Sequence, residues 1–244
     1  MPSRFTWFFP ASLLLLAACS DDNPITPPAT GTIAVRVVHA ISDGPMINVD
    51  VNGAVVISDL AFGTALPGTG ASYATINAAP ALSLIPSAGG TALLSATLAS
   101  LSGNGQYTVI ALGNAAEGAA PADTVVAFAD TSANDPASTL IRVVNAVDFA
   151  SVAGGDPVDV YIYPTGEARP ETPELSALAW AARSAYVSKS AGEYTIDVYP
   201  AGNKDAPLFS GALTAVNGGV RTLVLVDPTS EETTGSILTL SDRD

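Results

Sequence analysis

The chain has 244 residues, of which 48 % are hydrophobic and 13 % are charged. This composition excludes a disordered polar chain, because so apolar a chain can bury enough surface to offset its folding entropy. The formal net charge of −14 argues against a nucleic-acid partner, since that kind of binding depends on clustered lysine and arginine.

Residues 1–18 have the layout of a secretory signal peptide. Arg4 forms a short positive region, and residues 5–16 form an apolar core that is too short to cross a bilayer as a helix. Leu16, Ala17 and Ala18 then lead to Cys19, and this run resembles the lipobox of bacterial lipoproteins. The resemblance implies cleavage before Cys19 and acylation of its thiol. Because Cys19 is the only cysteine, we expect no disulfide, and we expect the membrane to be a partner through the N-terminal lipid.

Residues 19–31 are predicted to form a tether between the lipid and the folded part. The segment is rich in proline and threonine, which favours an extended spacer. Ser20, directly after the cysteine, resembles lipoproteins that are sorted to an outer membrane. The run from Ser20 through Asp21 and Asp22 also resembles surface-export signals of some lipoproteins. We therefore expect an envelope location at the outer membrane, with cell-surface exposure as an open alternative to the periplasmic side.

The rest of the chain contains an internal repeat. Residues 32–41 match residues 138–147, and both segments contain Arg-Val-Val followed by His39 or Asn145 and then alanine. Further matches follow in the same order along the chain, so we expect two domains, at residues 32–131 and 138–244. The second copy carries the larger loops, and its main insertion covers residues 167–176.

Strands are predicted throughout both copies. In residues 158–163 and 194–199, apolar residues alternate with polar or aromatic ones, which is typical of a sheet with one buried face. Glycine-rich segments at 103–105 and 217–219 are expected to form hairpin turns between strands. The predicted fold class is all-β, with two tandem antiparallel, immunoglobulin-like β-sandwiches. A small barrel is the alternative.

The motifs of the repeat resemble a known bacterial family. The Arg-Val-Val-His-Ala run at 36–40, the Asn-Val-Asp-Val-Asn-Gly run at 48–53 and the Val-Asp-Val-Tyr-Ile run at 158–162 are similar to the family called domain of unknown function 4397 (DUF4397). The resemblance extends over residues 32–242. It implies an exported or cell-surface protein, often with tandem copies, and it implies no catalytic residues. Asn145 stands where the family pattern has histidine, so a role for His39 cannot be shared by both copies.

A patch of tyrosines and carboxylates is the candidate ligand-binding site. Tyr161, Tyr163 and Tyr199 alternate with core residues and are expected on the exposed face of domain 2, beside Asp159 and Asp197. Stacking rings next to orienting carboxylates suit a polysaccharide or an envelope protein as a partner. The competing interpretation is that tyrosine is simply a favourable strand residue on a half-exposed sheet.

Little in the sequence favours catalysis, a cofactor or a metal. His39 is the only histidine and has no nucleophile motif beside it, so we expect a structural role for it. A zinc site lacks the necessary ligands. Calcium remains a weak alternative at Asp148, Asp156 and Asp159, and we predict no metal site and no cofactor.

These observations predict a non-catalytic envelope lipoprotein, a surface-displayed module with either a binding or a purely structural role. The alternative is a glycan-active envelope enzyme that uses Asp159 and Asp197 as its pair of carboxylates.

Overall fold

The computed structural model describes residues 31–70, 72–78, 81–98, 101, 103–115, 122–130, 135–148, 157–228 and 234–243. The predicted signal peptide, Cys19 and all of the tether except Gly31 lie outside the described residues. All the regular elements in the described part of the chain are strands, which confirms the all-β prediction. That part also contains no helix that is long and apolar enough to cross a membrane.

The strands fall into two halves along the chain. The first half contains β1 (Thr32–Ser42), β2 (Ile47–Val51), β3 (Ala54–Leu60), β4 (Thr64–Leu66), β5 (Ala74–Asn77), β6 (Ala81–Pro86), β7 (Leu94–Thr97), β8 (Gln106–Asn114) and β9 (Thr124–Ala129). The second half contains β10 (Thr139–Ala146), β11 (Val158–Pro164), β12 (Leu175–Leu178), β13 (Val187–Lys189), β14 (Gly192–Pro200), β15 (Phe209–Ala215), β16 (Val220–Val226) and β17 (Ser236–Arg243).

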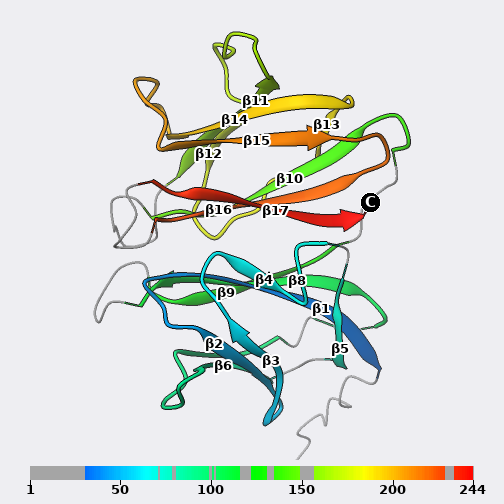
Figure 1. The fold of residues 1–244 in the computed structure, drawn as a ribbon, viewed down its shortest axis with the longest axis vertical. Coiled ribbons are helices and arrows are strands. Elements are labelled where there is room, and N and C mark those ends of the chain that lie inside the picture. The colour runs from blue at the N-terminus through cyan, green and yellow to red at the C-terminus, as the bar shows by residue number, and fades with distance from the viewer. Residues whose placement is uncertain are drawn as a thin grey trace, which may run out of the picture.

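Each half consists of two sheets packed face to face. In the first half the inner sheet has the order β4-β1-β8-β9, with β5 also paired to β1, and the outer sheet has the order β3-β2-β6-β7. In the second half the inner sheet is β13-β10-β16-β17 and the outer sheet is β12-β11-β14-β15. Figure 1 shows the four sheets stacked as layers, with the two outer sheets at the ends and the two inner sheets in the middle.

The prediction of purely antiparallel sheets is wrong for one strand pair in each half. The pairs β1–β8 and β10–β16 are parallel, and both lie at the centre of an inner sheet. The segments at 103–105 and 217–219 are also not hairpins within a sheet, because β7 and β15 belong to outer sheets whereas β8 and β16 belong to inner sheets. Each segment instead leads the chain from the outer sheet of its half to the inner sheet.

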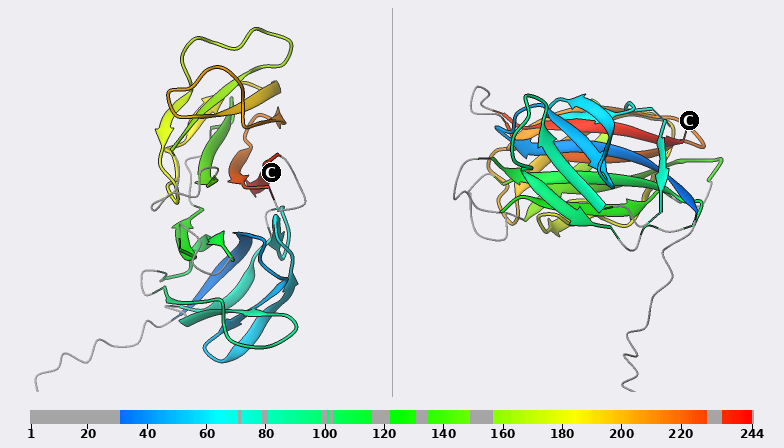
Figure 2. Two further views of the ribbon diagram at one scale, coloured as in Figure 1. Left: turned by 90° about the vertical axis from the view of Figure 1, so that its left-hand side faces the viewer. Right: turned by 90° about the horizontal axis from the view of Figure 1, so that it is seen from below.

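The inner sheets are buried on both faces. Alternate residues of β1, such as Val35 and Val37, pack into the core of the first half, while Val38 and Ala40 face the second half. Such burial explains why β1 reads as an apolar run without a polar face. Val144 and Ala146 of β10 lie in the same central cluster, so apolar side chains of both halves pack together between the inner sheets. Figure 2 (left) shows the first half below the second half.

Candidate functional site

The outer sheet of the second half brings the predicted site residues together. β11 and β14 are antiparallel neighbours, and their register places Tyr161 opposite Asp197 and Asp159 opposite Tyr199. We call the face that carries Asp159, Tyr161, Tyr163, Asp197 and Tyr199 the tyrosine face. The grouping predicted from the sequence is therefore present.

The predicted exposure of this face is wrong for two of its tyrosines. Tyr161 is fully buried and Tyr199 is only 5 % exposed, while Tyr163 is half-buried. The cover is the segment between β11 and β12, residues 165–174, which we call the strap; it forms the loop beyond β11 at the top of Figure 1. Arg169 reaches from the strap onto both rings, with its Cζ atom 4.6 Å from the centroid of Tyr161 and 4.6 Å from that of Tyr199.

The two carboxylates of the tyrosine face are held by hydrogen bonds. Asp159 accepts the backbone N–H groups of Ala177 at 2.7 Å and Gly202 at 2.9 Å. Asp197 accepts the hydroxyls of Tyr163 at 2.8 Å and Ser210 at 2.5 Å. Burial and this bond to Asp197 raise the pKa of Tyr163 to about 12, so its hydroxyl stays protonated and remains a donor at neutral pH.

The first half has the same strand geometry without the aromatic residues. The register of β2 and β6 places Asn48 where the second half has Asp159, and Asp50 and Ile85 where it has Tyr161 and Tyr199. Asn48 accepts the N–H of Asp59 at 3.0 Å, as Asp159 does with Ala177. No strap is present here, because β2 and β3 are joined by only two residues.

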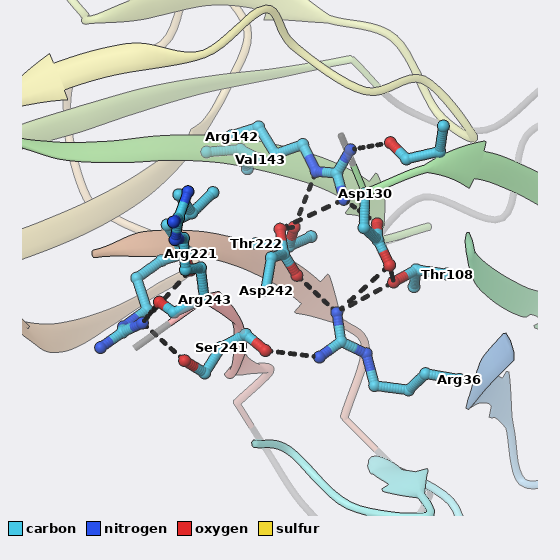
Figure 3. Close-up of polar contacts among 12 residues, drawn as sticks. Arg36, Thr108, Asp130, Arg142, Val143, Arg221, Thr222, Ser241, Asp242 and Arg243 are labelled. Atoms are coloured by element: carbon cyan, nitrogen blue, oxygen red, sulfur yellow. Dashed lines mark hydrogen bonds and ion pairs between the residues drawn. The ribbon is translucent and has the colours of Figure 1, made fainter. Parts of the chain in front are cut away.

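A second polar site, which the sequence did not reveal, lies between the two halves. Four charged side chains meet there, and the carboxylates of Asp130 and Asp242 lie between the guanidinium groups of Arg36 and Arg142 (Figure 3). All four side chains are at most 1 % exposed. We call this set the central ion network; its two positive and two negative charges cancel, as burial requires.

The contacts of the network are related by exchange of the two halves. Arg36 donates to Thr108 of its own half at 2.9 Å and to Asp242 of the other half. Arg142 donates to Thr222 of its own half at 2.7 Å and to Asp130 of the other half. Each arginine is thus bonded within its own inner sheet and across to the opposite one.

Aromatic rings and backbone groups complete the surroundings of the network. The Cζ atom of Arg142 lies 4.2 Å from the ring centroid of Phe128, and that of Arg36 lies 5.1 Å from the ring centroid of Tyr73. Burial raises the pKa of the Asp242 carboxyl above its ordinary value, and the adjacent Arg142 guanidinium opposes that rise. The arrangement stabilises one docking geometry of the halves.

His39 has the structural role that the sequence predicts. Its Nε2 donates to the carbonyl oxygen of Pro45 at 3.0 Å, and its Nδ1 accepts the N–H of Ile41 at 3.3 Å. Asn145 replaces it in the second half and accepts the N–H of Val147 at 3.0 Å. Burial lowers the pKa of His39, which favours the neutral ring that these two bonds require.

Among the described residues, no group of three or more histidine, cysteine, aspartate or glutamate side chains is placed to hold a metal ion. Of the three weak calcium candidates, Asp156 lies outside the described residues, Asp159 is engaged by backbone N–H groups, and Asp148 is buried.

Residues 33–153 match the family model described as "Domain of unknown function (DUF4397)". No curated protein matches the chain. Among solved structures, a leucine-rich repeat protein from Bacteroides thetaiotaomicron VPI-5482 is similar at 11 % identity and a TM-score of 0.19, over 80 % of this chain. The match covers 26 % of that protein's chain.

Proposed function

Since residues 33–153 match the DUF4397 family model, we propose that the protein is a non-catalytic, lipid-anchored module of the cell envelope. In this proposal two tandem, immunoglobulin-like β-sandwiches form one rigid body, held away from the membrane by the tether. The rigid body serves either to space other envelope components or to present a recognition surface.

The observation that carries the rigid-body part of this proposal is the central ion network. Two halves that moved independently would repeatedly expose or separate four buried charges, and breaking a buried ion pair is costly. The apolar cluster around the network, which includes Val38, Ile110, Val144 and Val224, adds to that cost. A fixed geometry is what a spacer or a display platform needs, whereas domain closure in enzymes needs a mobile hinge.

A distance measurement tests the rigid-body proposal. Cys19 is the only cysteine, so residues 20–244 form a cysteine-free background. Val55 and Ala212 are exposed strand residues, one in each half, and can be replaced by cysteine and spin-labelled. Double electron–electron resonance should give a single narrow distance distribution. A broad or bimodal distribution would contradict a rigid body.

Lipid anchoring is tested separately, because Cys19 lies outside the described residues. Cells that express the full chain with an alkyne-labelled fatty acid should yield a labelled, membrane-bound protein. Cys19→Ala, which leaves the signal peptide in place for export, should abolish the label. Retention of label in the variant would refute the lipidation proposal.

The hydrogen bonding of the carboxylates supports the non-catalytic form of the proposal. A glycan-active enzyme needs one carboxylate free to act as nucleophile or base and another free to donate a proton. Asp159 and Asp197 both accept two hydrogen bonds from the protein, and both residues are buried. We therefore do not retain the enzyme as a second candidate function.

A further inference from the structure

The tyrosine face has the composition of a receptor for a cation. Tyr161 and Tyr199 come from neighbouring strands, their ring centroids are 5.4 Å apart, and their planes are inclined by 74°. Asp197 lies opposite Tyr161 and Asp159 lies opposite Tyr199, so rings and carboxylates alternate over the face. Electron-rich ring faces attract guanidinium and ammonium groups, and neighbouring carboxylates strengthen that attraction.

The face already holds a cationic group from its own chain. Arg169 contacts both rings, and it is the only residue of 164–172 that is not exposed. The strap thus touches the tyrosine face chiefly through one guanidinium.

Arg169 leaves two polar groups at this site without a hydrogen-bond partner among the described residues. The Tyr161 hydroxyl and the Nη1 atom of Arg169 are both buried without a hydrogen-bond partner among the described residues. The Nη2 atom donates only to the carbonyl oxygen of Lys204, at 3.5 Å, and Arg169 forms no ion pair with a described carboxylate. Buried polar groups without partners cost free energy, so a guanidinium bound at a better angle would gain bonds that Arg169 does not make.

The strap is anchored to the domain by contacts at the surface. Lys204 donates to the carbonyl oxygen of Glu171 at 2.7 Å, and Lys189 pairs with Glu174 at 2.6 Å, with side chains 17 % and 31 % exposed. Exposed ion pairs of this kind contribute little to stability. The two-residue turn at the same place in the first half shows that this architecture also exists without a strap.

We propose that the tyrosine face is a binding site for a guanidinium group, which Arg169 occupies in cis and an external ligand occupies when the strap lifts. The chain's net charge of −14 favours the approach of a cationic ligand. The ligand is either a free alkylguanidine or an arginine side chain of a peptide. This site is independent of lipid anchoring and of the rigidity of the two halves.

The test measures binding of agmatine to residues 20–244 by isothermal titration calorimetry. Arg169→Gln removes the cis ligand and should bind agmatine at least about tenfold more tightly than the wild type, whose site is mostly occupied. Arg183→Gln is the matched control, because it removes an exposed arginine of the same half and should bind like the wild type. Adding Tyr199→Leu to Arg169→Gln should abolish binding.

A second variant guards against loss of folding. Replacement of residues 165–174 by a glycine-serine linker of the same length removes Arg169 without shortening the connection from Pro164 to Leu175, and it should bind agmatine as Arg169→Gln does. Agmatine should also raise the Tm of both variants by more than that of Arg183→Gln. The peptide acetyl-Gly-Arg-Gly-amide distinguishes the two ligand sources, since tighter binding than agmatine identifies a protein-borne arginine.

Two results would overturn the proposal. If Arg169→Gln and the strap replacement bind agmatine no more tightly than Arg183→Gln, Arg169 is only a brace for the strap. If choline, which has no N–H donors, binds as tightly as agmatine, the site does not recognise the guanidinium group.

Discussion

Neutralising Asp130 should lower the free energy of unfolding of the protein. Its carboxylate accepts hydrogen bonds from Thr108 at 2.6 Å, from Tyr73 at 2.9 Å and from Arg142, and it lies 3.8 Å from the guanidinium of Arg36. Asp130→Asn keeps the shape and one acceptor oxygen, but it leaves two buried arginines facing one carboxylate. Breaking a buried ion pair costs about 3–5 kcal/mol, and we expect the lower end because asparagine still accepts a hydrogen bond.

The effect is measurable by thermal unfolding of residues 20–244. A loss of about 3 kcal/mol lowers the Tm of a chain this size by about 6–12 °C. The control is Asp205→Asn at an exposed site, which should change stability by less than about 0.5 kcal/mol. Adding Arg142→Met to Asp130→Asn restores charge balance beside the Phe128 ring and should recover at least about 1 kcal/mol. An Asp130→Asn variant as stable as the control would refute our account of the network.

Two further predictions concern single positions that the two halves treat differently. Ala181 has φ 58°, and its counterpart in the first half, Gly63, has φ 68°. The two residues make equivalent hydrogen bonds: Gly63 N–H donates to the carbonyl oxygen of His39 and Ala181 N–H to that of Asn145, both at 2.8 Å. Ala181→Gly should therefore raise the free energy of unfolding by about 0.5–1 kcal/mol in urea titrations, with Gly63→Ala changing it in the opposite direction. Burial lowers the pKa of His39 below 6.5, so the unfolded chain takes up a proton more readily than the folded one. The resulting stability is complete above the ordinary histidine pKa and is lost as the pH falls from there towards the folded pKa. His39→Asn, which copies Asn145, should remove this dependence between pH 8 and 5; parallel curves for the variant and the wild type would show that His39 does not titrate.

The sequence identified the strands of the outer sheet in the second half because only one of their faces lies in the core. Val158, Val160 and Ile162 lie in the core, whereas Asp159 and Tyr161 between them lie on the other face of the sheet. This alternation appears in the sequence as a periodicity of two. The same pattern correctly put all three tyrosines and both carboxylates on one face. It failed to predict burial, because the strap that covers Tyr161 is a separate segment whose docking leaves no periodic signal.

The central ion network was missed because its partners are far apart in the sequence. Arg36 and Asp242 are 206 residues apart, and Arg36 stands alone within an apolar run. One signal was present: an arginine stands at the same place in both copies, inside an apolar strand, and each copy's last strand ends near an aspartate, Asp130 or Asp242. A charge repeated within an apolar run indicates a buried pair, since an isolated buried charge is too costly to retain.

The equivalent contacts that the two halves make in the central ion network affect how the sequences of the halves can diverge. Two identical subunits that docked through these inner sheets would acquire every substitution and insertion twice, once at each end of the assembly. In a single chain the two outer sheets can diverge in sequence while the central ion network keeps its arginines and aspartates. The strap exists at one end only, opposite a first half that keeps a two-residue turn. A single chain can therefore have two different outer sheets, and here the outer sheet of the second half has Arg169 over the rings of Tyr161 and Tyr199.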